Sequence, residues 1–146
     1  MPTYESSVAI AAEPNAIWPV LSDVANWPHW LPTVTKVVPI DGSRLVAGAR
    51  FVVYQPKLLP ATWRVTELDA PRRFVWEAQS PGLRMIAEHS VSQQAANSST
   101  VVLRFSFGGL LGGLFGRLFR SITKRYLTLE AAALRRTVEA SPNNVR

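Results

Sequence analysis

Cysteine is absent from this chain of 146 residues. Its absence excludes disulfide bonds, thiolate metal sites and cysteine nucleophiles, and it fits a reducing, cytoplasmic compartment. Long apolar runs are also missing. The stretch FSFGGLLGGLFG at 105–116 would span only about 18 Å as a helix, against about 30 Å of hydrocarbon in a bilayer. The first residues, MPTYESSVAIAAEP, lack a basic segment and a long apolar segment, so no signal peptide is expected.

Acidic residues are scarce at the C-terminal end. Residues 1–103 hold 8 basic and 8 acidic residues, whereas 104–146 hold 8 basic and only 2 acidic ones, so the net charge of +6 lies there. A basic segment can meet an anionic membrane or nucleic acid, or it can be a solvated helix face. No nucleic-acid-binding motif accompanies the charge, so no nucleic-acid partner is expected.

Metal-binding and catalytic motifs are missing as well. The two histidines, His29 and His89, are far apart, which does not predict a zinc site, and no cofactor is expected. No Lys-Ser or Lys-Thr follows the glycines, and no G-x-S-x-G occurs. No low-complexity linker interrupts the chain, so a single domain over 1–146 is expected, with 141–146 as a frayed tail.

Short segments rich in β-branched and aromatic residues predict an antiparallel sheet. A first strand is expected at 3–12, then two short helices, one opened by Glu13-Pro14-Asn15 and one within ANWPHWLP at 25–32. The later connections are too short for parallel crossovers and favour a meander. Its six strands are expected at about 33–40, 49–56, 61–68, 72–79, 83–91 and 100–107.

The last element contains no proline between about 110 and 139, so we expect one long amphipathic helix. It has the only apolar stripe long enough to cover the sheet, formed by Leu111, Phe115, Leu118, Phe119, Ile122, Tyr126, Leu129 and Ala133. A basic cluster lies beside the stripe and predicts transient contact with an anionic membrane. The cluster consists of Arg117, Arg120, Lys124 and Arg125.

Alternation along the strands predicts one covered face and one wet face for the sheet. In 84–91, for example, Met85, Ala87 and His89 alternate with Arg84 and Glu88. A curved sheet does not lie flat against a straight helix, so the inward side chains line either an apolar pocket or a filled core. The candidate ligand-binding residues are Phe51, Val53, Trp63, Trp76, Met85, His89, Leu103, Phe105, Phe115 and Phe119.

The order of elements resembles the START-like, Bet v 1-like (SRPBCC) superfamily, in particular its polyketide cyclase/dehydrase and lipid-transport branch. The local patterns that carry the resemblance are PNAIWPVLSDVANWPHWLP, GARFVVYQP, WRVTELDAPRRFVWEA, AEHSV and FSFGGLLGGLFGRLF. The resemblance implies an α+β helix-grip fold, in which a curved antiparallel sheet of about seven strands wraps a long C-terminal helix. It also implies a cavity for a hydrophobic molecule, lipid or polyketide-like. It implies no mechanism, because the superfamily includes cyclases, carriers and ligand-sensing modules.

His89 is the best candidate among the few inward polar residues, which also include Gln55 and Glu67. An imidazole can act as a general acid or base near neutral pH, and Glu67 would orient it if the strands bring the two together. That arrangement would suit a cyclase/dehydrase-type enzyme. The alternatives, which we favour, are a core histidine satisfied by one hydrogen bond or a polar handle for a ligand's head.

The glycines of 108–116 suggest a local role for FSFGGLLGGLFG. Gly108-Gly109 would turn the chain from the last strand into the helix, while Gly112, Gly113 and Gly116 weaken its first turns. We therefore expect 108–116 either to gate the cavity or to pack tightly against the WPHW segment.

Overall fold

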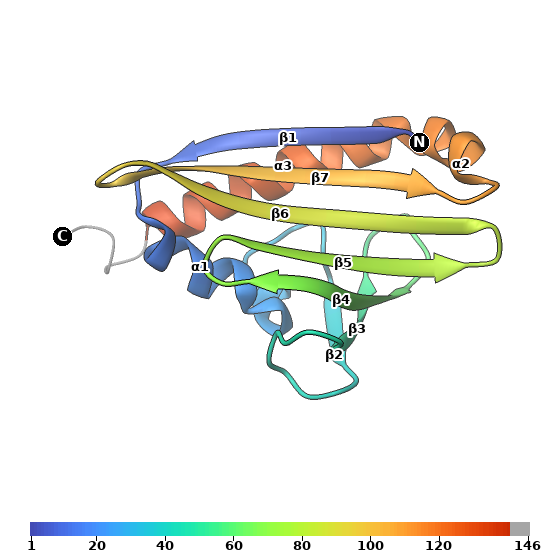
Figure 1. Ribbon diagram of the computed structural model, residues 1–146, viewed down its shortest axis with the longest axis horizontal. Coiled ribbons are helices and arrows are strands. Elements are labelled where there is room, and N and C mark those ends of the chain that lie inside the picture. Colours follow the sequence, from blue (N-terminus) through green and yellow to red (C-terminus); the bar gives the residue numbers. More distant parts are fainter. Residues whose placement is uncertain (141–146) are drawn as a thin grey trace.

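A seven-stranded antiparallel sheet is the main element of the computed structural model, which describes residues 1–140 (Figure 1). The predicted tail at 141–146 lies outside these residues. The strands run in the order β1-β7-β6-β5-β4-β3-β2, so the first strand lies beside the last. Their bounds are β1 Thr3–Ile10, β2 Lys36–Pro39, β3 Arg50–Tyr54, β4 Ala61–Asp69, β5 Arg73–Ser80, β6 Leu83–Ala95 and β7 Ser98–Gly108. Together with the helices, this sheet confirms the predicted α+β helix-grip class.

Several strands differ in length from the sequence-based expectation: β1 and β3 are shorter than expected, and β2, β6 and β7 show why. β2 begins only at Lys36, because Thr33 and Val34 are buried in a turn in which the Val34 N–H donates to the Leu31 carbonyl at 3.1 Å. β6 and β7 extend further than predicted, into a hairpin whose residues 92–97 are exposed. Apolar alternation ends where the hairpin leaves the core, so the pattern did not mark its full length.

The two faces of the sheet differ as predicted. On β6, Ala87 and His89 point inward and are buried. On the outer face, Arg104 of β7 bonds Glu5 of β1 at 2.7 Å and approaches Glu88 of β6 at 3.7 Å. These ion pairs link three neighbouring strands on the wet side and leave the concave side to apolar contacts.

The C-terminal helix is two helices, α2 Gly112–Leu118 and α3 Arg120–Glu139, and not the single helix that was expected. Phe119 separates them, with φ −95° and ψ 13° outside the α-helical range. The break has a packing cause: α2 rests on β7, whereas α3 rests mainly on β1. Three residues expected in the apolar stripe are exposed, Leu111 by 40%, Leu118 by 67% and Leu129 by 36%, although Leu111 also lines the cavity described below. The buried residues of α3 are Leu127, Ala131, Ala133, Leu134 and Val138.

The glycines of α2 allow close packing on the N-terminal strand. A Cβ at Gly116 would lie 2.5 Å from Pro2 Cγ, and one at Gly112 would lie 2.8 Å from the Phe107 carbonyl oxygen. The Tyr4 hydroxyl also donates to the Gly116 carbonyl at 2.7 Å. The expected packing of 108–116 on the WPHW segment is therefore wrong, because β1 and β7 occupy that side of α2. The gate hypothesis for 108–116 stays a prediction.

Two short helices close the other end of the space between sheet and α3. They are α1 Pro14–Ser22 and the 3₁₀ helix η1 Val24–His29. Ile17 and Leu21 of α1 and Trp27 of η1 are buried, and α1 packs on both α3 and β6. The Trp27 Nε1–H donates to the Leu21 carbonyl at 3.0 Å, which fixes η1 against α1.

Candidate functional site

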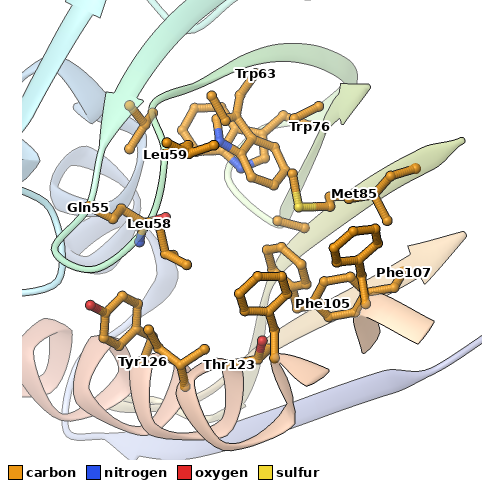
Figure 2. Close-up of a pocket in the computed structure, with 18 of the residues that line it drawn as sticks. Gln55, Leu58, Leu59, Trp63, Trp76, Met85, Phe105, Phe107, Thr123 and Tyr126 are labelled. Carbon is orange, nitrogen blue, oxygen red and sulfur yellow. The ribbon is translucent and has the colours of Figure 1, made fainter. Parts of the chain in front are cut away.

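A cavity of about 750 Å³ lies between the sheet and the C-terminal helices (Figure 2). Strands β3 to β7 form one wall, α2 and α3 form the other, and the loop 55–60 between β3 and β4 borders the opening. Small-molecule pockets typically enclose about 300–1,000 Å³. The sheet and α3 therefore enclose a space of the size that a small organic ligand needs.

Aromatic side chains dominate the strand wall. The rings of Trp63 and Trp76 lie 5.6 Å apart, and Phe105 meets Trp63 edge-on at 5.7 Å. Phe107 continues the row at 5.0 Å from Phe105, and the flexible Met85 side chain lies between the tryptophans and these rings (Figure 2). Neighbouring strands supply these residues because inward positions recur at every second residue.

The helix wall is formed by one face of α2 and α3. Phe115 and Phe119 stack at 5.9 Å with an interplanar angle of 12°. Thr123 and Tyr126 follow at helical spacing and face the strand wall (Figure 2). The Tyr126 hydroxyl donates to the Pro56 carbonyl, so α3 and the loop 55–60 are joined at the opening.

The structure brings nine of the ten candidate ligand-binding residues together around this cavity, namely Val53, Trp63, Trp76, Met85, His89, Leu103, Phe105, Phe115 and Phe119. The tenth, Phe51, is fully buried behind the wall, with its ring 6.1 Å from that of Trp76. It supports a lining residue and does not face the cavity. That these nine residues contact a ligand stays a prediction.

His89 lies inside an aromatic cluster at the inner end of the cavity. Its ring stacks on Phe74 at 4.0 Å and lies 5.8 Å from Trp27 and 5.9 Å from Trp76. Nδ1 is 3.4 Å from the Phe74 carbonyl oxygen, which can only accept, so Nδ1 carries the proton. Burial lowers the pKa of His89 from 6.5 to about 4, although that bond opposes the shift. The imidazole is therefore neutral at pH 7, and a catalytic role for it stays a prediction.

The expected pairing of Glu67 with His89 is wrong. The Glu67 carboxylate is exposed and pairs with Arg73 at 3.3 Å. Simple alternation from the inward Val65 would place Glu67 inward too, but a bulge shifts the register between these two residues. Gln55, the other polar candidate, does line the cavity, beside Leu58 (Figure 2).

Glu130 of α3 is a lining residue that the sequence analysis missed. It lies one helical turn beyond Tyr126 on the cavity face, and its Oε1 accepts a hydrogen bond from the Thr33 hydroxyl at 3.3 Å. Burial raises the pKa of Glu130 from 4.5 to about 7, with the Thr33 bond opposing the shift. A signal was present, because Glu130 falls at helical spacing from Phe119 and Tyr126.

Several leucines on the elements that form the cavity walls are exposed. Leu110, Leu114 and Leu118 are 99%, 64% and 67% exposed at α2, and Leu59 of the loop 55–60 is 89% exposed. The predicted basic cluster is exposed next to them, on α2 and on the first turns of α3. The surface of α2 and of the first turns of α3 therefore combines apolar and cationic side chains.

Within residues 1–140, no group of three or more histidine and acidic side chains is arranged to hold a metal ion. In the same part of the chain, every helix is too short or too polar to cross a membrane.

Comparison with known families gives one match over almost the whole chain. A family model described as polyketide cyclase / dehydrase and lipid transport matches residues 1–139. No curated protein matches the sequence.

Solved structures with the same fold are numerous. The Zhui aromatase/cyclase from Streptomyces sp. R1128 superimposes with a TM-score of 0.78 at 19% identity, covering 99% of this chain and 95% of that one. Norcoclaurine synthase from Thalictrum flavum gives 0.76 at 16% identity, covering 95% and 94%. XoxI from Bacillus cereus gives 0.73 at 17% identity, covering 96% and 97%. At such identities the similarity concerns the fold alone.

Proposed function

The chain belongs to the polyketide cyclase/dehydrase and lipid transport family, and from this premise we propose that it binds a hydrophobic small molecule in the cavity between its sheet and its C-terminal helices. The ligand is lipid-like or polyketide-like. A cytoplasmic location stays a prediction.

One observation carries the proposal: the inward aromatic side chains leave about 750 Å³ unfilled. Protein interiors are otherwise packed at the density of organic crystals, so an empty volume of this size forfeits a large amount of van der Waals contact. An apolar ligand would restore that contact and remove its own surface from water. Tryptophan, phenylalanine and methionine side chains suit such a ligand because they offer large apolar area.

Native mass spectrometry of the freshly purified protein, with solvent extraction of what it releases, tests the proposal. We expect a hydrophobic molecule to be released from the wild-type protein. Thr123 points into the cavity, so Thr123→Trp should fill part of it and weaken binding about tenfold or more. Thr128 is exposed on the same helix, so Thr128→Trp is the matched control and should retain the ligand.

Two results together would overturn the proposal. They are a clean apo mass and an intrinsic tryptophan fluorescence that does not respond to a panel of lipids and aromatic compounds. The inward aromatics would then be plain core.

The exposed leucines favour a second, compatible function, docking of the cavity opening on an anionic membrane. Leu114 and Leu118 lie one turn apart on α2, whose Phe115 lines the cavity, and Leu59 is exposed on the loop 55–60, which also lines it. Inserting leucines into a bilayer removes apolar area from water, while the adjacent basic cluster is attracted to acidic lipid headgroups. A carrier docked in this way would present its cavity opening to the bilayer.

Co-sedimentation with vesicles tests the docking. Wild-type protein should bind vesicles that contain phosphatidylserine, and this binding should weaken as salt is raised. Leu114→Ser/Leu118→Ser should lower the affinity about tenfold or more, because each insertion contributes about 1.5–3 kcal/mol. The matched control is Leu129→Ser, which changes a partly exposed leucine on α3, outside α2. Equal losses in both variants, or equal binding to neutral vesicles, would contradict docking through α2.

A further inference from the structure

The inner end of the cavity carries two polar side chains from facing elements, Glu130 of α3 and His89 of β6. Both also line a second, small cavity behind them, of about 10 Å³, which has room for about one water molecule. Trp27 and Leu103 line both spaces as well, so this junction is otherwise apolar. We refer to Glu130 and His89 as the inner pole.

The hydrogen bonds of the inner pole leave acceptors and no donors. The Thr33 hydroxyl donates to Glu130 Oε1 at 3.3 Å, and His89 Nδ1–H is directed at the Phe74 carbonyl at 3.4 Å. The described part of the chain supplies no donor for Glu130 Oε2 or for His89 Nε2. A carboxylate oxygen and an unprotonated imidazole nitrogen both accept hydrogen bonds. Two acceptors therefore face the cavity without protein partners.

The neighbouring donors are already engaged. The Trp27 Nε1–H donates to the Leu21 carbonyl at 3.0 Å, and the Tyr126 hydroxyl donates to Pro56 at the opening. Lys57 also lines the cavity, but it lies on the loop 55–60 at the opening and not at the inner pole.

The charged side chains of the flanking strands are also engaged, on the outer face of the sheet. Glu88 of β6 pairs with Arg73 of β5 at 2.8 Å, and Arg104 of β7 pairs with Glu5 of β1 at 2.7 Å. No cation within the described residues is paired with Glu130. The missing donor must therefore come from water or from a ligand.

We propose that the inner pole binds a hydrogen-bond donor at the end of an otherwise apolar ligand, a hydroxyl or an ammonium group, with the Glu130 carboxylate as the main acceptor and His89 Nε2 as the second. The proposal rests on the proposed function of the cavity and deepens it, because it names the ligand's polar end. The ligand would enter polar end first and leave its apolar part between Trp63, Trp76 and Phe105. Above pH 7, a carboxylate at that end would meet two acceptors and be rejected.

The charge state of Glu130 supports this selection. Burial raises the pKa of Glu130 to about 7, so the carboxyl group is an acceptor above pH 7 and carries its own proton below it. An ammonium ligand stays protonated across this range and would gain a charge-assisted hydrogen bond as the pH rises. A hydroxyl ligand would show a weaker dependence on pH, because a protonated carboxyl group still offers its carbonyl oxygen as an acceptor.

Isothermal titration of four ten-carbon probes tests the proposal: decanol, decylamine, nonyl methyl ether and decanoate, at pH 8 and pH 6. At pH 8 we expect decanol and decylamine to bind the wild-type protein about fivefold or more tightly than the ether, the size of one net hydrogen bond. Glu130→Gln should remove most of the decylamine preference and reduce that for decanol less, because the amide oxygen still accepts. Glu139→Gln, on the same helix but outside the cavity, is the matched control.

The outcomes separate this proposal from the proposed function. If all four probes bind with equal affinity to the wild-type protein and to Glu130→Gln, the cavity function stands and the donor-selective pole is overturned. If decanoate binds as tightly as decylamine at pH 8, the pole is likewise overturned. If no probe binds, the donor-selective pole is overturned, and the mass spectrometry and fluorescence measurements decide the cavity function separately. Glu130→Asp replaces Glu130→Gln if the latter fails to fold, and it should lower the decylamine preference through a shorter reach.

Discussion

Phe74→Ala is expected to lose about 3–5 kcal/mol of unfolding free energy, the largest effect of any single truncation that we predict. The Phe74 side chain is fully buried on β5, stacks on His89 at 4.0 Å, and meets Trp18 at 6.1 Å and Trp76 at 5.6 Å. Removing it would leave a hole bounded by rings that strand geometry holds in place. The surroundings can therefore collapse only partially. The variant loses the transfer free energy of the ring, and the remaining cavity destabilises it further.

Urea denaturation of the wild-type protein and the variants measures this loss. Phe115→Ala is the matched control, because the same atoms are removed from a half-buried ring on the cavity wall. We expect it to cost only about 1 kcal/mol, since the ring already borders empty space. Its main effect should be weaker ligand binding. Equal losses in the two variants would mean that the cavity wall is packed as densely as the core, and would count against an open cavity.

Titration of the inner pole should give the second large effect on the free energy of unfolding. The pH dependence has opposite signs for Glu130 and His89. Burial raises the pKa of Glu130 from 4.5 to about 7, so its stabilising contribution is complete below pH 4.5 and is lost as the pH rises through 7. Burial lowers the pKa of His89 from 6.5 to about 4, so its contribution is complete above pH 6.5 and is lost as the pH falls through 4. Each shift corresponds to at most about 3 kcal/mol.

In the wild-type protein, the changes of unfolding free energy with pH that Glu130 and His89 cause cancel between pH 4.5 and 6.5. Single variants should reveal each of them. Glu130→Gln should become more stable than the wild type as the pH rises from 4.5 to 8, by up to about 3 kcal/mol. His89→Phe should remove the loss of stability that His89 causes between pH 6.5 and 4. Urea midpoints measured at each pH give the two curves.

The difference between each variant and the wild type isolates the substituted group, because all other carboxyl groups are common to both proteins. Glu77, for example, has its pKa lowered mainly by the hydrogen bond from Arg84, and it titrates identically in every curve. A Glu130→Gln curve parallel to that of the wild type would show that Glu130 titrates as an ordinary exposed carboxyl group.

Most of the fold could be predicted from the sequence because local patterns report it directly. Period-two alternation identified the inward residues of β3 to β7, and short turn-rich connections indicated an antiparallel order. The break at Phe119 could not be predicted. It follows from α2 and α3 packing on different strands, and no proline or charge marks it. Apolar residues on both sides of the break kept an apparent single stripe, so Leu118 and Leu129 were assigned to the wrong face.

The candidate site was predictable where it depends on alternation and not where it depends on distant contacts. Trp63, Trp76 and Phe105 follow from their strands. The position of Glu67 was predicted wrongly, because an alternating pattern of residues does not reveal a β-bulge. Glu130 was missed because its hydrogen-bond partner, Thr33, lies 97 residues away in the sequence.

The neighbouring positions of β1 and β7 have a consequence for synthesis of the chain. Thr3 and its partner Ser106 are separated by 103 residues, so a ribosome must make most of the protein before the first strand finds its neighbour. Until then, the segment 3–10 has no strand to pair with, and the sheet built by β2 to β6 lacks the edge on which α3 rests. Folding should therefore be late and concerted, governed by long-range pairing. A nascent chain stalled before β7 would expose the tryptophan-lined concave face to chaperones.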